Sequence, residues 1–289
     1  MTYTLYLGDR AYSSWSLRAW LLVEVFDLPV QTRYVDFHAA DVASQLADVA
    51  PARTVPTLKT PEGAIVSESL AIAEELASRF PDAPLWPSEP KARAIARGLA
   101  SEMHSGFAAL RSACPMNLRI AYEGFPVSEA VAADVARIEA IWANAQEETG
   151  GDWLCGDYSI ADAFFAPVAM RIATYDLPVG PATQAYVARH LTHGPLRRWR
   201  AMGLVEGETL ARYAMDHATR PWPGPAPRPA KAIETGTPEN AACPYSGKPP
   251  THLLETQGRV IGFCNAFCRD KTVADPEAWP AFMALLERR

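Results

Sequence analysis

The spacing of hydrophobic and polar residues over positions 1–80 alternates between strand and helix periods. Residues 2–8 (TYTLYLG) alternate and carry β-branched and aromatic side chains, whereas apolar positions in residues 15–27 recur at helical spacing. The same reasoning predicts, in chain order, a strand over 31–37, a short helix over 41–50, strands ending at 60 and spanning 64–69, and a helix over 69–80. This β-α-β-α-β-β-α order predicts a small α/β domain over residues 1–80.

Two Pro-rich stretches divide the rest of the chain. PDAPLWPSEP (81–90) precedes residues 91–218, where long helical patterns, including one over 92–113 that ends at Cys114-Pro115, predict an all-helical second domain without strands. Residues 219–240 are expected to be a linker, because PWPGPAPRP within them has proline at every other position and favours an extended spacer. Residues 241–289 then form a separate unit.

Composition limits the classes of partner. The chain of 289 residues has a formal net charge of -6 with scattered Lys and Arg, so it has no general attraction for nucleic acid or anionic lipid. No charged and apolar leader opens it, and no apolar run approaches the ~20 residues that span a bilayer. We therefore expect a cytoplasmic protein. Its five cysteines, three of them in the last 50 residues, favour thiol or metal chemistry over a disulfide framework.

Serines are concentrated in YLGDRAYSSWSLRAW (6–20), where the first predicted strand passes into the first helix. A hydroxyl at Ser13 or Ser14 is suited to cap the first helical turn. The same helix start presents unpaired N–H groups and a partial positive charge, which stabilise an anion such as a thiolate. The residues alone leave both roles open, the cap and the donor that helps to ionise a bound thiol.

Two later segments suit the other parts of a peptide-like thiol. At Val55-Pro56 a proline begins an apolar strand, where a cis bond would turn the chain and expose the backbone of Val55. Ser67-Glu68-Ser69 opens a helix whose N–H groups and hydroxyls suit a carboxylate, while Glu68 suits an ammonium group. Each feature alone is commonly an edge proline or a helix cap, but the combination in this order is specific.

Through these segments, YSSWSLR, VPTL and SESLAI in thioredoxin-like order, the chain resembles the cytosolic glutathione transferases over residues 1 to about 218. The resemblance implies a thioredoxin-like N-terminal domain, a helical domain, glutathione as co-substrate and a homodimer. The implied glutathione contacts are Ser13 or Ser14 to the sulfur, Val55 with Pro56 to the cysteinyl backbone, and Glu68 with Ser69 to the γ-glutamyl end.

The segment SSWSLRAW looks most like the zeta-type pattern, in which the first of two adjacent serines is the important one, so Ser13 ranks above Ser14. Trp15 stands where the zeta pattern has Cys, which argues against assuming maleylacetoacetate isomerisation. Arg53-Thr54 replaces the usual Gly-Lys before Val-Pro, at the position of one glutathione contact.

A metal is the expected stabiliser of residues 241–289, because 49 residues are too few to bury a sufficient core unaided. Twenty residues separate Cys243 from Cys264, and Cys264 and Cys268 are four positions apart, so that one helix face can present both to an ion. Three thiolates favour zinc, or a soft metal such as copper(I). The alternative is three reduced cysteines packed in a metal-free mini-domain.

The segments CPYSGKP, GRVIGFCNAFC and DPEAWP resemble the YHS and TRASH type of treble-clef module, which implies metal binding by this unit. The fourth ligand is open between His252, Asp270, Asp275 and a water.

We therefore expect a glutathione transferase-like enzyme that activates glutathione as a thiolate, with Ser13 as donor, for attack on a small electrophile. Glu102, His104 and Arg111 are expected either to face the cleft above the sulfur or to be solvated or paired with one another. The competing hypothesis is a non-catalytic transferase fold that binds glutathione or protein and carries a metal-sensing or docking tail.

Overall fold

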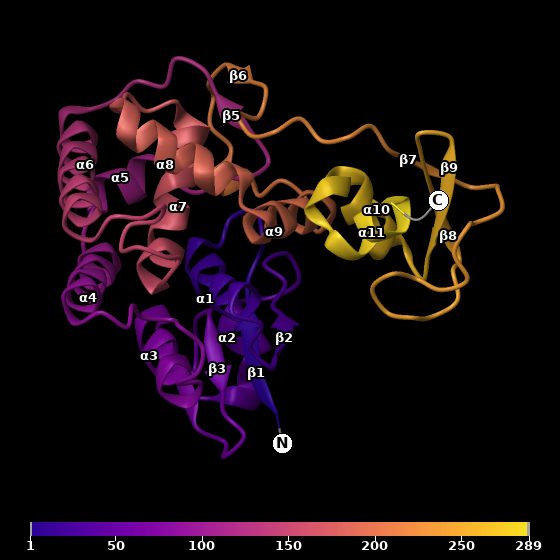
Figure 1. The fold of residues 1–289 in the computed structure, drawn as a ribbon, viewed down its shortest axis with the longest axis horizontal. Coiled ribbons are helices and arrows are strands. Elements are labelled where there is room, and N and C mark those ends of the chain that lie inside the picture. Colours follow the sequence, from indigo (N-terminus) through magenta and orange to yellow (C-terminus); the bar gives the residue numbers. More distant parts are fainter. Residues whose placement is uncertain (1, 288–289) are drawn as a thin grey trace. The chain divides into compact units, whose positions relative to one another are not determined.

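The computed structural model describes residues 2–287, which group into two compact units (Figure 1). The first unit extends to His190 and includes Thr209–Pro223. The second joins Leu191–Glu208 with the residues from Gly224 onward. Within the described residues, no helix has both the length and the apolar character needed to cross a membrane.

The first unit opens with a four-stranded sheet in the order β2-β1-β3-β4. Strand β1 (Tyr3–Leu7) pairs in parallel with β2 (Val30–Tyr34) and antiparallel with β3 (Thr57–Lys59), which pairs antiparallel with β4 (Ile65–Ser67). In this register Leu5 lies opposite both Thr32 and Leu58. The connecting helices are α1 (Ser14–Val25), α2 (Val42–Gln45) and α3 (Ser69–Arg79). The α/β order expected for residues 1–80 is confirmed, and it is thioredoxin-like.

Helix α1 is buried over most of its length. Leu17, Leu21 and Leu22 are fully inaccessible, and α1 packs against both α3 and α7 (Ile160–Tyr175). Because most of its surface is buried, α1 is stabilised by the elements that enclose it and not by a single apolar face. Its start, which carries the serines, is therefore held in a fixed place.

Helices make up most of the remainder of the first unit, as expected. They are α4 (Pro90–Ser105), α5 (Ala108–Ala113), α6 (Glu129–Thr149), α7 and α8 (Pro181–Thr192). Every residue of α7 is buried. The spacing of Ser159 and Asp162 in the sequence is that of a capping box, and the two residues form this box reciprocally at the start of α7. A two-residue strand, β5 (Ala121–Tyr122), pairs with β6 (Thr219–Arg220), so the expectation of no strand in residues 91–218 was wrong.

The single helix expected over residues 92–113 was also wrong, because the chain breaks between α4 and α5. Gly106 is extended, and Phe107 has a left-handed backbone with φ 58. Phe107 is buried with its ring 6.4 Å from that of Phe165. Packing of this aromatic side chain on α7 overrides the helical periodicity of the local sequence.

The second unit has an antiparallel sheet of β7 (Lys231–Ile233), β8 (His252–Thr256) and β9 (Arg259–Phe263). Gln257 and Gly258, both with positive φ, make the tight turn between β8 and β9. Helices α10 (Ala266–Ala274) and α11 (Pro280–Glu287) follow, and Phe263, Trp279 and Phe282 form part of the buried core. Strands β6 and β7 lie inside the range expected to be a linker, whereas Pro221–Pro229 contains neither helix nor strand.

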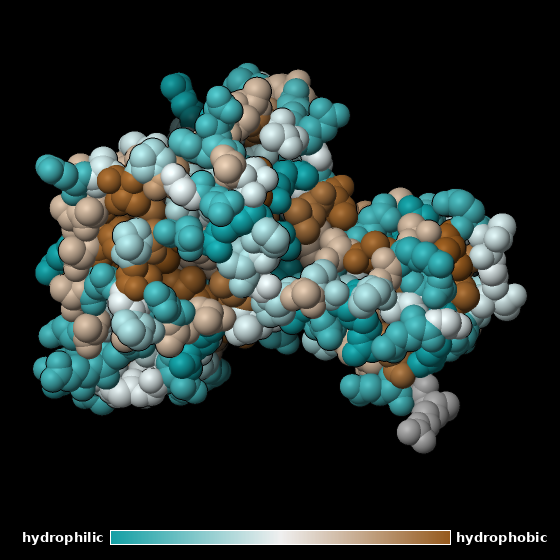
Figure 2. All heavy atoms as spheres, turned by 90° about the horizontal axis from the view of Figure 1, so that it is seen from above, coloured by the Kyte–Doolittle hydropathy of each residue, from teal (hydrophilic) through white to brown (hydrophobic). Residues whose placement is uncertain are grey.

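Helix α9 (Gly194–Val205) packs against α10 within this second unit. Arg197 donates two hydrogen bonds to Asp275, at 2.9 and 2.7 Å, and Arg198 donates to the backbone oxygen of Ala278. The C-terminal part of the second unit, referred to below as the tail, therefore contacts α9, a helix that precedes the Pro-rich segment in the sequence. On the face drawn in Figure 2, hydrophilic residues predominate and hydrophobic residues form smaller areas among them.

Candidate functional site

The first unit has a cleft of about 530 Å³ beside the start of α1. Segments that are distant in the sequence line this cleft. They are the start of α1, the turn before β3, the start of α3, residues that follow α4, and a residue of α7. The predicted site residues that line it are Ser13, Ser14, Val55, Pro56, Glu68 and Ser69. All six glutathione-site residues predicted from the sequence therefore face one cleft.

Ser13 is the N-cap of α1. Its hydroxyl oxygen accepts from the backbone N–H of Ser16 at 3.3 Å, and its hydroxyl donates to Ser16 Oγ at 2.9 Å. Ser16 Oγ in turn accepts from the N–H of Gly8 at 2.9 Å. Ser13 is 8% exposed, and its hydrogen bonds are directed into the turn that connects β1 to α1.

Ser14 has a different set of partners. Its hydroxyl oxygen accepts from Nη2 of Arg171, on α7, at 3.4 Å. That guanidinium is fixed by two further bonds, from Nε to the backbone oxygen of Cys114 at 2.8 Å and from Nη1 to that of Pro167 at 3.2 Å. Because Ser14 acts as an acceptor here, its own O–H proton remains available for a group in the cleft.

The peptide bond between Val55 and Pro56 is cis, as expected. Ser69 begins α3, is 1% exposed, and its hydroxyl has no hydrogen-bond partner among residues 2–287. The preceding Glu68 has a positive φ of 72, and its carboxylate is largely exposed. The α3 start thus presents to the cleft a buried hydroxyl and an accessible carboxylate.

Arginines give the cleft a positive character. Arg53, Arg111, Arg171 and Arg212 line it, and Glu68 is the sole acidic residue in that lining. Burial, and after it the neighbouring charge of Arg111, lower the pKa of Arg171 to about 10. Among the described residues neither Arg111 nor Arg171 forms an ion pair with a carboxylate, so their charge is available to an anionic ligand.

The ring of Trp15 contacts two guanidinium groups, of which that of Arg111 lines the cleft. The guanidinium carbon of Arg18 lies 4.3 Å from its ring centroid, and that of Arg111 lies 4.8 Å away. Arg18 is 1% exposed and also lies 5.0 Å from the ring of Phe164. The aromatic ring at position 15 therefore holds Arg111 at the edge of the cleft through cation-π contact.

The residues of α4 contribute less than expected. Glu102 is paired with Arg137 at 2.8 and 3.0 Å, so it takes the alternative of a paired surface residue. His104 lies 3.8 Å from the carboxylate of Glu68, and burial followed by the charge of Arg18 lowers its pKa. Arg111 does face the cleft. The sequence did not identify Arg171 as a site residue. No local pattern around Arg171 indicates that it contacts Ser14, which lies 157 positions earlier in the chain.

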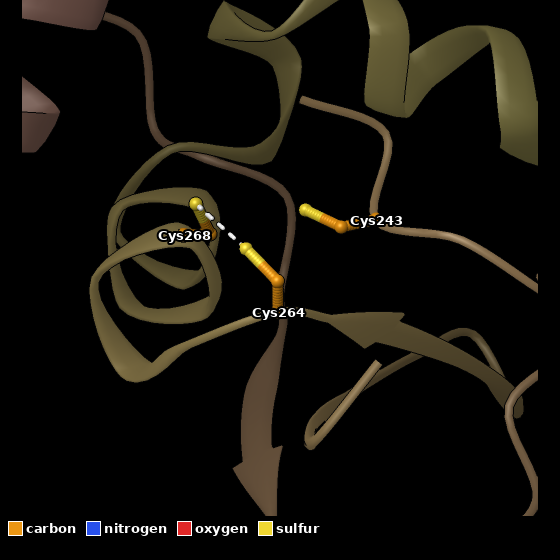
Figure 3. A group of neighbouring side chains, drawn as sticks. All are labelled: Cys243, Cys264 and Cys268. Atoms are coloured by element: carbon orange, nitrogen blue, oxygen red, sulfur yellow. Dashed lines mark hydrogen bonds between the residues drawn. The ribbon is translucent and has the colours of Figure 1, made fainter. Parts of the chain in front are cut away.

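The predicted thiol cluster is present in the second unit. Figure 3 shows Cys243 on a loop, Cys264 after β9 and Cys268 on α10, with their sulfur atoms directed toward one another. All three sulfurs lie within 4.8 Å of one another. Cys264 precedes the helix, whose N-cap is Asn265, so the expectation that one helix face presents both cysteines was wrong.

The sulfur spacing of the cluster suits a metal, and the pKa values of two of its thiols are shifted in opposite directions. Thiolates at about 2.3 Å from a tetrahedral zinc lie about 3.8 Å apart, and the sulfurs of Cys264 and Cys268 are 3.9 Å apart. Burial raises the pKa of Cys243, but hydrogen bonds from the backbone of Tyr245, Cys264 and Ser246 outweigh it and lower that pKa to about 7. Burial and the two neighbouring thiols raise the pKa of Cys268 to about 12.

None of the three side chains considered from the sequence as a fourth ligand joins this cluster among the described residues. Asp275 receives both hydrogen bonds of Arg197, Asp270 is bonded by Arg269 at 2.7 Å, and Nδ1 of His252 lies 2.9 Å from the hydroxyl of Thr251. Within residues 2–287, the group of possible metal ligands at this place consists of the three cysteines.

This chain is similar in sequence to a protein family and to curated relatives. The family described as "Glutathione S-transferase, N-terminal domain" matches residues 12–79. The chain is 30% identical over 178 residues to "Probable maleylacetoacetate isomerase" of Caenorhabditis elegans, covering 61% of this chain and 82% of that protein. It is 26% identical over 180 residues to "Maleylacetoacetate isomerase" of Rattus norvegicus, covering 61% and 81%.

Solved structures agree on the fold. A glutathione transferase homolog from Burkholderia gl BGR1, with bound glutathione, is 26% identical with a TM-score of 0.53, covering 70% of this chain and 98% of that one. A diazinon-metabolizing glutathione S-transferase of the silkworm Bombyx mori is 22% identical with a TM-score of 0.55, covering 71% and 98%.

Proposed function

Because this chain belongs to the glutathione S-transferase family, we propose that its cleft ionises the thiol of glutathione through Ser14 and directs it at a small, anionic electrophile. The protein is a glutathione transferase-like enzyme. The observation that carries the proposal is the bond from Arg171 to Ser14, which leaves the Ser14 proton free.

The two serines at the start of α1 then have different roles, one structural and one chemical. Ser13 caps the helix and holds it against the β1 turn through Ser16. Ser14 donates its proton to the glutathione sulfur, while the N–H groups of the helix start and the Arg171 charge stabilise the thiolate. This assignment reverses the order expected from the zeta-type pattern, and the kinetics of the two alanine variants test it.

Recognition of glutathione is assigned to the turn before β3 and the start of α3. The backbone of Val55, before the cis Pro56, pairs with the cysteinyl part of the peptide. The unpartnered hydroxyl of Ser69 donates to the γ-glutamyl carboxylate, and Glu68 binds the ammonium group. Both charges of the γ-glutamyl end are satisfied in this arrangement.

The electrophile is proposed to carry a carboxylate. Arg111 and Arg171 lie on the helical side of the cleft and have no acidic partner among the described residues, so they suit a second anion beside the thiolate. The curated relatives are named for an acid substrate, maleylacetoacetate, which is of this class. Trp15 replaces the zeta-type Cys, so isomerisation itself is not part of the proposal.

Turnover tests the proposal. Purified protein is assayed with glutathione and either a neutral aromatic halide or an α-halo carboxylate, and product is measured by chromatography. We expect turnover of both, with the higher kcat/KM for the carboxylate. Binding of glutathione without turnover of either electrophile would favour the non-catalytic alternative.

For the second unit we propose a structural zinc site of treble-clef type, held by Cys243, Cys264 and Cys268. The support is the close approach of the three sulfurs, the low pKa of Cys243 and the hairpin followed by α10. The metal would fix the loop of Cys243 to the β9–α10 junction. A homodimer remains a proposal from the family resemblance, and sedimentation of the purified protein tests it. A cytoplasmic location remains a proposal from the sequence.

A further inference from the structure

The thiol cluster of the second unit is open on one side. Cys243 is 2% exposed and Cys268 8%, whereas Cys264 is only partly buried. Two exposed residues, Ser246 and Asn265, lie beside it and donate to its sulfur at 3.1 and 3.4 Å. The buried side of the cluster is therefore protein, and the side of Cys264 is accessible and lined by hydrogen-bond donors.

Three sulfurs do not complete the coordination that such a site prefers. Structural zinc sites are almost always four-coordinate, and a site with three protein ligands keeps one position for an exogenous group. The candidates for a fourth protein ligand are engaged elsewhere, as Asp275 is by Arg197. A soft ion held by three thiolates favours another soft donor at that position.

A positive charge lies beside the cluster. The ammonium group of Lys271, three positions after Cys268 on α10, is 8% exposed and lies 4.0 Å from the Trp279 ring centroid and 4.3 Å from that of Tyr245. Three thiolates and a divalent ion carry one net negative charge, and a fourth thiolate adds another. A buried cation held by aromatic rings offsets this charge.

We propose that a metal held by Cys243, Cys264 and Cys268 keeps its fourth position for the thiolate of a small external thiol, and that glutathione is that thiol. The inference rests on the proposed metal site of the second unit. Glutathione, for which the first unit provides a cleft, would enter from the Cys264 side and release its thiol proton to solvent as it binds. The entry side is polar, because the hydroxyl of Ser246 and the amide of Asn265 donate to Cys264 Sγ there.

The full chain is loaded with cobalt(II), and its absorption spectrum is measured in two steps. The spectrum of the cobalt protein alone tests the metal site, and a titration with glutathione then tests the inference. Sulfur-to-cobalt charge-transfer absorption in the near ultraviolet reports thiolate ligation, and Cys264→Ser should lower it by about one third as the thiolates fall from three to two. Absence of this absorption, with no cobalt retained after gel filtration, would overturn the metal site and the inference with it.

Glutathione is then titrated into the cobalt protein. We expect the charge-transfer band to rise by about one third, as the thiolates increase from three to four, with a shift of the visible bands. Mercaptoethanol should produce the same change, whereas S-methylglutathione, which cannot form a thiolate, should not. Bound cobalt with a spectrum that glutathione leaves unchanged would overturn the inference alone, as would an equal response to S-methylglutathione.

Discussion

Arg171 donates from Nη2 to the hydroxyl oxygen of Ser14 at 3.4 Å, which links α7 to the start of α1 across 157 positions of the chain. The guanidinium is itself fixed by the backbone oxygens of Cys114 and Pro167. The helical part of the first unit therefore orients a hydroxyl that belongs to the thioredoxin-like part. Ser13, one residue earlier, faces the turn and bonds to Ser16 instead.

Substitution of the two serines should have separable effects. Ser14→Ala removes a donor to a charged sulfur, worth about 1.5–3 kcal/mol, so kcat should fall about 10- to 100-fold with little change in glutathione affinity. Ser13→Ala removes a helix cap and should lower the free energy of unfolding by about 1 kcal/mol. Steady-state kinetics and urea denaturation measure both. A larger kcat loss in Ser13→Ala would restore the order expected from the zeta-type pattern.

Arg111 should determine preference among electrophiles. Arg111→Gln removes a cation from the cleft edge, so kcat/KM for a carboxylate-bearing electrophile should fall about 10-fold or more, by the loss of roughly 1.5–3 kcal/mol. With a neutral electrophile the same variant should change little, and Arg111→Lys, which retains the charge, is the matched control. Equal losses with both electrophiles would contradict an anionic substrate.

Ser69 and Glu68 should act on affinity rather than on thiol ionisation. Ser69→Ala and Glu68→Gln each remove a contact to a charged end of glutathione, so binding should weaken by about 1.5–3 kcal/mol. Calorimetric titration measures the affinity, and the pH dependence of kcat should be unchanged in both. Affinity equal to that of the unsubstituted protein in both variants would mean that the α3 start has only a structural role.

Metal content should depend on the thiol cluster. Purified protein should contain about one zinc per chain, and Cys264→Ser should lower this toward zero, because two thiolates hold the ion poorly. Cys155→Ser, a buried thiol of the first unit, is the control and should retain the metal. A chelator should expose residues 241–287 to protease while glutathione binding persists. Metal-free protein with a resistant tail would support packed cysteines instead.

The pair of Arg197 and Asp275 should stabilise the second unit. Their side chains are 17% and 10% exposed, and the bond is bidentate. Asp275→Asn leaves a mostly buried guanidinium with only the more distant carboxylate of Glu277, which should cost about 3 kcal/mol. Glu277→Gln is the control, since Glu277 lies 3.6 Å from Arg197 and is 36% exposed, so its loss should cost at most about 1 kcal/mol. Protease resistance of residues 224–287 reports the difference.

Local patterns in the sequence were sufficient to predict much of this protein. Period-two and helical spacings predicted the β-α-β-α-β-β-α order, the capping box of Ser159 and Asp162 was recognisable, and the spacing of three cysteines indicated their cluster. These features depend on the pairing of neighbouring residues or on a repeated period. Such information is contained within a short stretch of chain.

Packing between distant segments decided the rest. The helix over 92–113 breaks because Phe107 packs near Phe165, and Ser14 rather than Ser13 has a free proton because Arg171 reaches it from α7. The last helix of the predicted helical domain, α9, groups with the tail through Arg197 and Asp275. Each outcome depends on a side chain more than fifty positions away. Local propensity differs by only about 1 kcal/mol between alternatives, so one such contact reverses it.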